Sequence, residues 1–144
     1  MSILRESGQI PIRDMKRINF PFSTKFVLAL IGRGPIKIFG RKINTAGPRL
    51  RCFKRSLVCA CCGLKGSVFF LERHKNNDDW HFNLYGQLPD GTLKLMTRDH
   101  WIPISNGGNN GLSNSQTMCI ECNRKKGAKL PKEHHGKYKV CIRT

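Results

Sequence analysis

Two short cysteine pairs constrain the fold of this chain more than any other feature of its sequence. The pairs are Cys59-Ala-Cys-Cys62 and Cys119-Ile-Glu-Cys122. Two such pairs can supply the four thiolates that Zn²⁺ takes in tetrahedral structural sites. The stretch between the pairs is longer than in a simple zinc ribbon. We therefore expect a folded segment whose two ends are tied together by a zinc ion.

The number of cysteines bears on the same question. The chain has seven, and an odd count argues against a disulfide framework. Cys61 could replace a neighbour as a ligand, but we favour Cys59 and Cys62 because a two-residue spacer is the commoner chelating geometry. The alternative is that the paired cysteines are buried or reactive free thiols.

The charge balance points to a polyanionic partner. The 144 residues include 26 Lys and Arg against 9 Asp and Glu, a formal net charge of +17. Such an excess most commonly attracts nucleic acid. The longest apolar stretch is far shorter than the roughly 20 residues of a membrane span, and a secretory signal would also need a longer one. We expect a soluble, cytoplasmic protein with no membrane partner.

Residue patterning predicts a β-rich middle preceded by a basic arm. Residues 1–50 hold ten Lys and Arg against two acidic residues. This arm is either a phosphate-contacting extension or a solvated flank. Within it we expect a capped helix over 23–31 and a strand or hairpin over 35–43. Further strands are expected over 67–72, 80–85 and 93–97, and a helix that ends at Gly127.

Two segments after the expected strands resemble one nuclease family. They read Arg98-Asp-His-Trp-Ile-Pro-Ile-Ser-Asn-Gly-Gly108 and Leu112-Ser-Asn-Ser-Gln-Thr-Met-Cys-Ile-Glu-Cys-Asn-Arg-Lys-Lys-Gly127. This order resembles that of HNH endonucleases, in which an Asp-His pair, a Pro and Gly-Gly loop and an Asn precede Cys-x-x-Cys-Asn-x-x-Lys-Gly. Together with the first cysteine pair, it is similar to the zinc-bearing, bacteriophage-type members of that family.

The resemblance covers roughly residues 50 to 128 and implies an α+β fold. That fold is a small ββα-metal (His-Me finger) domain with extra strands, stapled by a four-cysteine zinc site. The chain then divides into a basic N-terminal arm at 1–50, an HNH nuclease domain at 51–130 and a basic tail at 131–144. The fold implies a strand over 115–118, whereas Ser113-Asn-Ser-Gln116 also reads as a capping box that would start a helix. We favour the strand.

Phosphodiester hydrolysis needs a base that deprotonates water and a cation that stabilises the phosphate. His100 carries an imidazole, which suits a base at neutral pH. Asp99 is a hard oxygen ligand suited to Mg²⁺ or Mn²⁺, and Asn123 offers an amide oxygen beside a cysteine of the second pair. By resemblance, Asp99 and Asn123 hold the catalytic cation, His100 is the general base, and Asn114 braces the loop and orients the histidine. The same resemblance implies products with a 5′-phosphate and a 3′-hydroxyl.

A basic run follows the expected metal ligand Asn123, and such a run is either a phosphate-binding surface or a solvated face. We favour nucleic-acid contact by Arg124, Lys125, Lys126, Lys129 and Lys132.

These features together predict a metal-dependent HNH endonuclease or nickase acting on DNA, in host cytoplasm if the chain is phage-encoded. The expected cofactors are structural Zn²⁺ and catalytic Mg²⁺ or Mn²⁺. The alternative is a non-catalytic, zinc-stabilised module that binds nucleic acid or a protein on the same scaffold. RNA is also possible as a substrate, because a metal-activated water does not distinguish the 2′-hydroxyl. No feature of the sequence indicates an oligomeric state.

Overall fold

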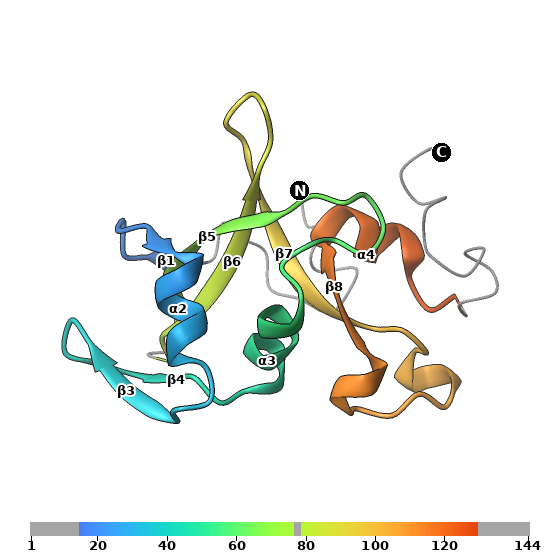
Figure 1. Cartoon of the computed structure of the whole chain (residues 1–144), viewed down its shortest axis with the longest axis horizontal. Coiled ribbons are helices and arrows are strands. Elements are labelled where there is room, and N and C mark those ends of the chain that lie inside the picture. Colours follow the sequence, from blue (N-terminus) through green and yellow to red (C-terminus); the bar gives the residue numbers. More distant parts are fainter. Residues whose placement is uncertain (1–14, 77–78, 130–144) are drawn as a thin grey trace.

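The computed structural model describes residues 15–76 and 79–129 (Figure 1). The elements in chain order are β1 (Met15–Arg17), β2 (Phe22–Ser23), α2 (Thr24–Leu30), β3 (Pro35–Ile38), β4 (Arg41–Asn44), α3 (Pro48–Arg55), β5 (Gly66–His74), β6 (His81–Gln87), β7 (Leu93–His100), β8 (Ser115–Cys119) and α4 (Ile120–Lys126). Two short 3₁₀ turns, Ile104–Asn106 and Leu112–Asn114, lie between β7 and β8.

An antiparallel sheet organises the molecule. Its strand order is β1-β5-β6-β7-β8, and β2 pairs with the other half of β5 beside β1. The strands expected over 67–72, 80–85 and 93–97 are present as β5, β6 and β7. Strand β7 runs on to His100, because its last residues pair with β8.

Residues 115–118 form a strand, as expected from the fold of the resembling family. Ser115 lies opposite His100 in the register of β7 and β8, and Gln116 lies opposite Asp99. A helix starting at Asn114 would leave the edge of β7 unpaired, so ladder pairing outweighs the local capping box. Strands β7 and β8 and helix α4 therefore follow one another as a ββα unit.

The described part of the expected basic arm is built into the same sheet. Strands β1 and β2 pair with β5, and Arg17 forms an ion pair of 2.7 Å with buried Glu72. Phe22, Val27 and Ile43 are buried in the common core. Residues 15–50 thus bury an apolar face that the charge count of this segment does not reveal.

Two local expectations within that segment are confirmed. Helix α2 begins after Ser23, whose side-chain oxygen accepts a hydrogen bond from the Phe26 backbone N–H at 3.1 Å. Strands β3 and β4 form a two-stranded hairpin in which Ile36 lies opposite Ile43.

The core lies between the sheet and helices α2 and α3. Phe69, Leu71, Phe82 and Leu84 of β5 and β6 are fully buried there, together with Phe53 of α3. Helix α4 covers β7 and β8. Across residues 15–76 and 79–129, the longest helix is the eight-residue α3, so none is long and apolar enough to span a bilayer.

Candidate active site and cysteine cluster

The four paired cysteines converge into one cluster. The sulfur atoms of Cys59, Cys62, Cys119 and Cys122 all lie within 4.8 Å of one another. In each pair the backbone N–H of the second cysteine donates to the sulfur of the first at 3.5 Å. Such a group of thiols can hold a metal ion such as zinc. Cys61 is not part of this group of four, so the geometry favours Cys62 over Cys61 as the second ligand.

The thiols of the cluster share hydrogen bonds that separate their pKa values, and those with Cys119 and Cys59 raise the pKa of Cys122. Hydrogen bonds from Cys119 and Cys122 lower the pKa of the Cys59 thiol far below its ordinary value, and they outweigh the effect of burial. A thiolate is the form of cysteine that binds a metal. The cluster joins the turn around the first pair to the start of α4, where Cys119 is the N-cap.

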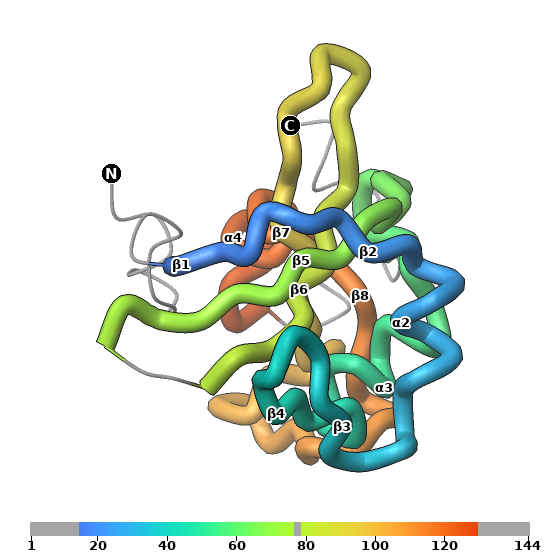
Figure 2. Tube along the Cα trace, turned by 90° about the vertical axis from the view of Figure 1, so that its left-hand side faces the viewer, coloured from blue at the N-terminus to red at the C-terminus, as the bar shows by residue number. Residues whose placement is uncertain are grey.

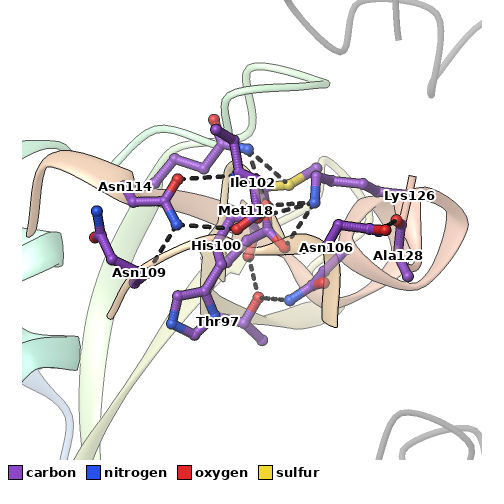
Figure 3. A network of polar contacts seen from close by, with 12 residues as sticks. Thr97, His100, Ile102, Asn106, Asn109, Asn114, Met118, Lys126 and Ala128 are labelled. Carbon is purple, nitrogen blue, oxygen red and sulfur yellow. Dashed lines mark hydrogen bonds and ion pairs between the residues drawn. The ribbon is translucent and has the colours of Figure 1, made fainter. Parts of the chain in front are cut away.

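On the α4 side of β7, Asp99 lies in a buried polar contact. Its Oδ2 accepts a hydrogen bond of 2.9 Å from the Gln116 side chain, and the Lys126 ammonium lies 3.3 Å from the same oxygen. Burial raises the pKa of Asp99, while Gln116 and Lys126 act to lower it. Figure 3 shows Lys126 reaching across to the end of β7, where it also donates to the His100 carbonyl at 2.9 Å.

Asn123 faces the same side of the hairpin. Its Nδ2 donates to the Thr97 hydroxyl at 2.8 Å, and that hydroxyl donates to the Met118 carbonyl. Thr97 and Asp99 are two residues apart on one strand and so share a face. The Asn123 Oδ1 has no hydrogen-bond partner among the described residues. A carboxylate and a free amide oxygen on one face fit a hard divalent cation such as Mg²⁺ or Mn²⁺.

His100 projects to the other side of the strand end, where Asn110 holds it. The distance from His100 Nε2 to Asn110 Oδ1 is 2.7 Å, and Arg98 donates to the same Oδ1 at 2.9 Å. A guanidinium only donates, so the shared atom of Asn110 is an oxygen and His100 Nε2 carries the proton. The other ring nitrogen, Nδ1, then has a free lone pair.

Asn114 clamps the loop that follows His100. Its side chain accepts from the Ile102 N–H and donates to the Ile102 carbonyl, both at 2.9 Å, and also donates to the Asn109 carbonyl at 2.8 Å (Figure 3). Gly108 packs under this clamp, because a Cβ there would lie 1.8 Å from the Ile102 oxygen. The loop is also tied to the end of α4, since the Asn106 side chain donates to the Ala128 carbonyl.

Residues 90–139 match the HNH endonuclease family model. The matched segment contains β7, β8 and α4 with all four expected catalytic residues: Asp99, His100, Asn114 and Asn123. The match supports a likeness of this segment to HNH endonucleases. No curated protein and no solved structure matches the chain.

The basic run after Asn123 includes both exposed and buried side chains. Lys125 and Lys129 are exposed and Arg124 is half-buried, whereas Lys126 is buried and paired with Asp99. Lys126 is therefore not available for the nucleic-acid contact that the sequence suggested. Lys132, like the rest of the expected tail, lies outside the described residues.

Three residues of the matched segment hold the site but were not predicted from the sequence. Gln116 holds Asp99, Thr97 holds Asn123, and Asn110 holds His100. Gln116 becomes identifiable only from the register of β7 with β8, which places it opposite Asp99. Asn110 lies in a Gly- and Asn-rich stretch that reads as an ordinary loop, so no local signal distinguishes it.

Proposed function

We propose that the protein is a metal-dependent HNH endonuclease or nickase that hydrolyses phosphodiester bonds in DNA. One observation carries the proposal. His100 is held with Nδ1 free on one side of the end of β7, while oxygen ligands of Asp99 and Asn123 lie on the other. Because Asp99 and His100 are adjacent on the strand, a phosphate placed across its end would meet both.

Each side chain then has a defined task. Asp99 and Asn123 would hold the cation, and a bound Mg²⁺ or Mn²⁺ supplies stabilisation of the negative charge that develops on the phosphate. His100 Nδ1 takes a proton from the attacking water, and Asn110 keeps the proton on Nε2. Asn114 keeps the loop closed so that the imidazole remains oriented.

The opposite placement of these groups suits an in-line displacement. In phosphoryl transfer, the attacking and leaving oxygens lie roughly in line on opposite sides of phosphorus. A base on one side of the strand end and cation ligands on the other match that requirement. His100 would then lie on the side of the attacking water, and the resemblance to HNH endonucleases implies a 5′-phosphate and a 3′-hydroxyl as products.

The cysteine cluster serves this site indirectly in our proposal. A structural Zn²⁺ on the four thiolates would fix the first turn of α4, and Asn123 follows Cys122 directly. Exposed Lys125 near the end of α4 and exposed Lys129 just beyond it, with half-buried Arg124, would bind flanking phosphates of the DNA.

A second candidate function has one observation in its favour. The Lys126 ammonium already lies against the Asp99 carboxylate, so a positively charged side chain stands where a metal ion would bind this acid. A non-catalytic module that binds nucleic acid or a protein on the HNH scaffold would need no other cation there.

Plasmid nicking separates the two functions. Supercoiled DNA is incubated with Mg²⁺ or Mn²⁺ and the protein, and the ends formed are tested for religation, which requires a 5′-phosphate and a 3′-hydroxyl. The wild type should nick, His100→Ala should be slower by about 10²–10⁴-fold, and added imidazole should restore part of the rate. The control Ser105→Ala, an exposed position in the same loop, should nick normally.

Two results would count against the proposal. Nicking by His100→Ala at the wild-type rate would show that His100 is not the general base. A wild type that binds DNA but never nicks would favour the non-catalytic module. Parallel reactions with single-stranded DNA and RNA define the substrate.

A further inference from the structure

Phenylalanine rings gather on the surface around the β3–β4 hairpin, outside the candidate active site. Phe20, Phe26 and Phe39 are exposed by 48%, 47% and 55%. Phe20 and Phe26 pack on buried Phe22, with ring centroids 4.8 and 5.8 Å away, and Phe39 lies 5.5 Å from Phe20. Phe22 in turn contacts Phe82 of the core at 5.3 Å. We call these three exposed rings the aromatic face, and its anchoring in the core holds it rigid.

The most exposed ring occupies an unfavourable backbone position. Phe39 is at the tip of the β3–β4 hairpin with a φ of +51°, and it is the one described non-glycine residue with a positive φ. Gly40 follows at +74°. Two positive φ values in succession define a turn that favours Asn-Gly. A bulky ring at the first position is costly there, and 55% of it remains exposed.

The hairpin carries a second unfavourable feature. Lys37 lies directly opposite Lys42 in the register of β3 and β4, and both are exposed. Like charges on directly opposed strand positions repel, and neither lysine has an ion-pair partner among the described residues. Both features become favourable if the ligand of this hairpin is anionic and has flat rings.

The hairpin lies at the same end of the molecule as the loop of residues 101–114. Figures 1 and 2 both show these two segments at the lower end, with α3 beside them. Helix α3 presents three exposed cations, Arg51, Lys54 and Arg55, and Arg55 donates to the Leu112 carbonyl of that loop. Positive charge therefore continues from the hairpin towards the candidate active site.

We propose that the aromatic face binds unpaired bases of a nucleic acid, while Lys37 and Lys42 contact its phosphates. Inside a duplex, neighbouring base pairs cover both faces of each base, so an exposed phenyl ring stacks on an unpaired base without the cost of unstacking a pair. The inference shares with the proposed nuclease function the premise that nucleic acid is the ligand, and it adds a preference for single-stranded or locally opened segments.

The test measures binding of the full chain by fluorescence anisotropy without added divalent cation. The probes are a labelled single strand, an abasic strand with the same number of phosphates, and a blunt duplex. Phe39→Asn removes the ring and places the favoured Asn-Gly pair in the turn. We expect about tenfold weaker binding of the single strand, unchanged binding of the abasic strand, and an unchanged or higher melting temperature. Phe39→Tyr, which keeps a ring, should bind like the wild type.

A charge variant separates the two parts of the surface. Lys37→Gln with Lys42→Gln should weaken binding of the normal and the abasic strand alike. The slope of log K against log salt should decrease in magnitude by about 1.4, since each phosphate contact on a single strand contributes about 0.7. Phe39→Asn should leave this slope unchanged.

Three results would overturn the inference. One is that Phe39→Asn and the wild type bind the single strand equally well. Another is that Phe39→Asn weakens binding of the abasic strand as much as binding of the normal strand. The third is a concentration-dependent dimer, seen by sedimentation, that Phe39→Asn abolishes, because the face would then join two copies of the chain. Nicking is not part of this measurement, so a failure of the proposed nuclease activity would leave the outcome readable.

Discussion

The ammonium of Lys126 lies 3.3 Å from the carboxylate of Asp99, and the two side chains are only 1% and 7% exposed. Lys126 is the last residue of α4. It belongs to a run of three cations that the sequence alone predicts to be exposed to solvent. The pairing of β7 with β8 places Asp99 beneath this helix, so one of the three cations faces inward.

Lys126→Met should destabilise the protein strongly. Removing one partner of a buried ion pair leaves the other charge without compensation, which costs roughly 3–5 kcal/mol in the free energy of unfolding. Urea denaturation measures the change. Lys125→Met, the exposed neighbour, should stay within about 0.5 kcal/mol. Combining Lys126→Met with Asp99→Asn should recover part of the loss, and a double variant less stable than Lys126→Met would contradict the pairing.

Asn110→Ala should slow nicking without unfolding the protein, because the imidazole of His100 would lose the acceptor that holds its Nε2 proton. We expect kcat to fall by about tenfold, a part of the 10²–10⁴-fold contribution of a positioned base, with KM unchanged. Asn110→Asp retains an acceptor for both His100 and Arg98 and should restore most of the rate. Asn109→Ala serves as the neighbouring control. An equal loss in both alanine variants would argue for general loop damage.

Cys122→Ser should release the structural metal and lower the melting temperature sharply. The free energy of binding a structural zinc is part of the free energy of folding, about 10–16 kcal/mol in zinc-finger peptides. Elemental analysis gives the metal content, and circular dichroism gives the melting temperature. Cys61→Ser should keep its metal, since Cys61 lies in the core and outside the cluster. Metal loss in Cys61→Ser with retention in Cys122→Ser would reverse the ligand assignment.

Lys125→Gln and Lys129→Gln should each reduce the salt dependence of duplex binding. One lost phosphate contact decreases the slope of log K against log salt by about 0.9 in magnitude. Titrations at several salt concentrations, without divalent cation, measure the slope. If a substitution leaves the slope unchanged, that lysine does not contact the DNA.

The stability of the protein should fall as the pH drops below about 6.5, in part through His81. Burial lowers the pKa of this imidazole from 6.5, and the charge of Arg49 lowers it further. The unfolded chain therefore takes up the proton at a higher pH than the folded one, and the stabilisation is lost as the pH falls towards the folded-state pKa. Urea denaturation between pH 7.5 and pH 5.5 should show a shallower dependence for His81→Gln. An NMR titration that gives His81 a pKa above 6.5 would contradict this.

Local sequence signals predicted several elements correctly. Ser23 marks the start of α2, the alternation over 35–43 predicts the β3–β4 hairpin, and the two-residue spacers select the cysteines that meet. Each of these signals lies within a few neighbouring residues, where spacing directly sets geometry. The order Asp99, His100, Asn114 and Asn123 is also readable from the chain, and the family match covers it.

The contacts that hold the site could not be predicted in this way. Gln116 meets Asp99 only because β7 pairs with β8 in one register, and Asn110 meets His100 through the folding of the loop between these strands. The joining of β1 and β2 to β5 was hidden for a similar reason, since Arg17 and its partner Glu72 are far apart in the chain.

The chain alone determined which chemical groups are present and which close neighbours act together: the thiol pairs, the Asp-His step and the basic run after Asn123. Tertiary structure decided the direction in which each group faces. It turned Lys126 inward, left Phe39 exposed, and placed His100 and Asp99 on opposite sides of one strand. The physical reason is that side-chain direction depends on strand register and helix packing, which arise from contacts between residues distant in sequence.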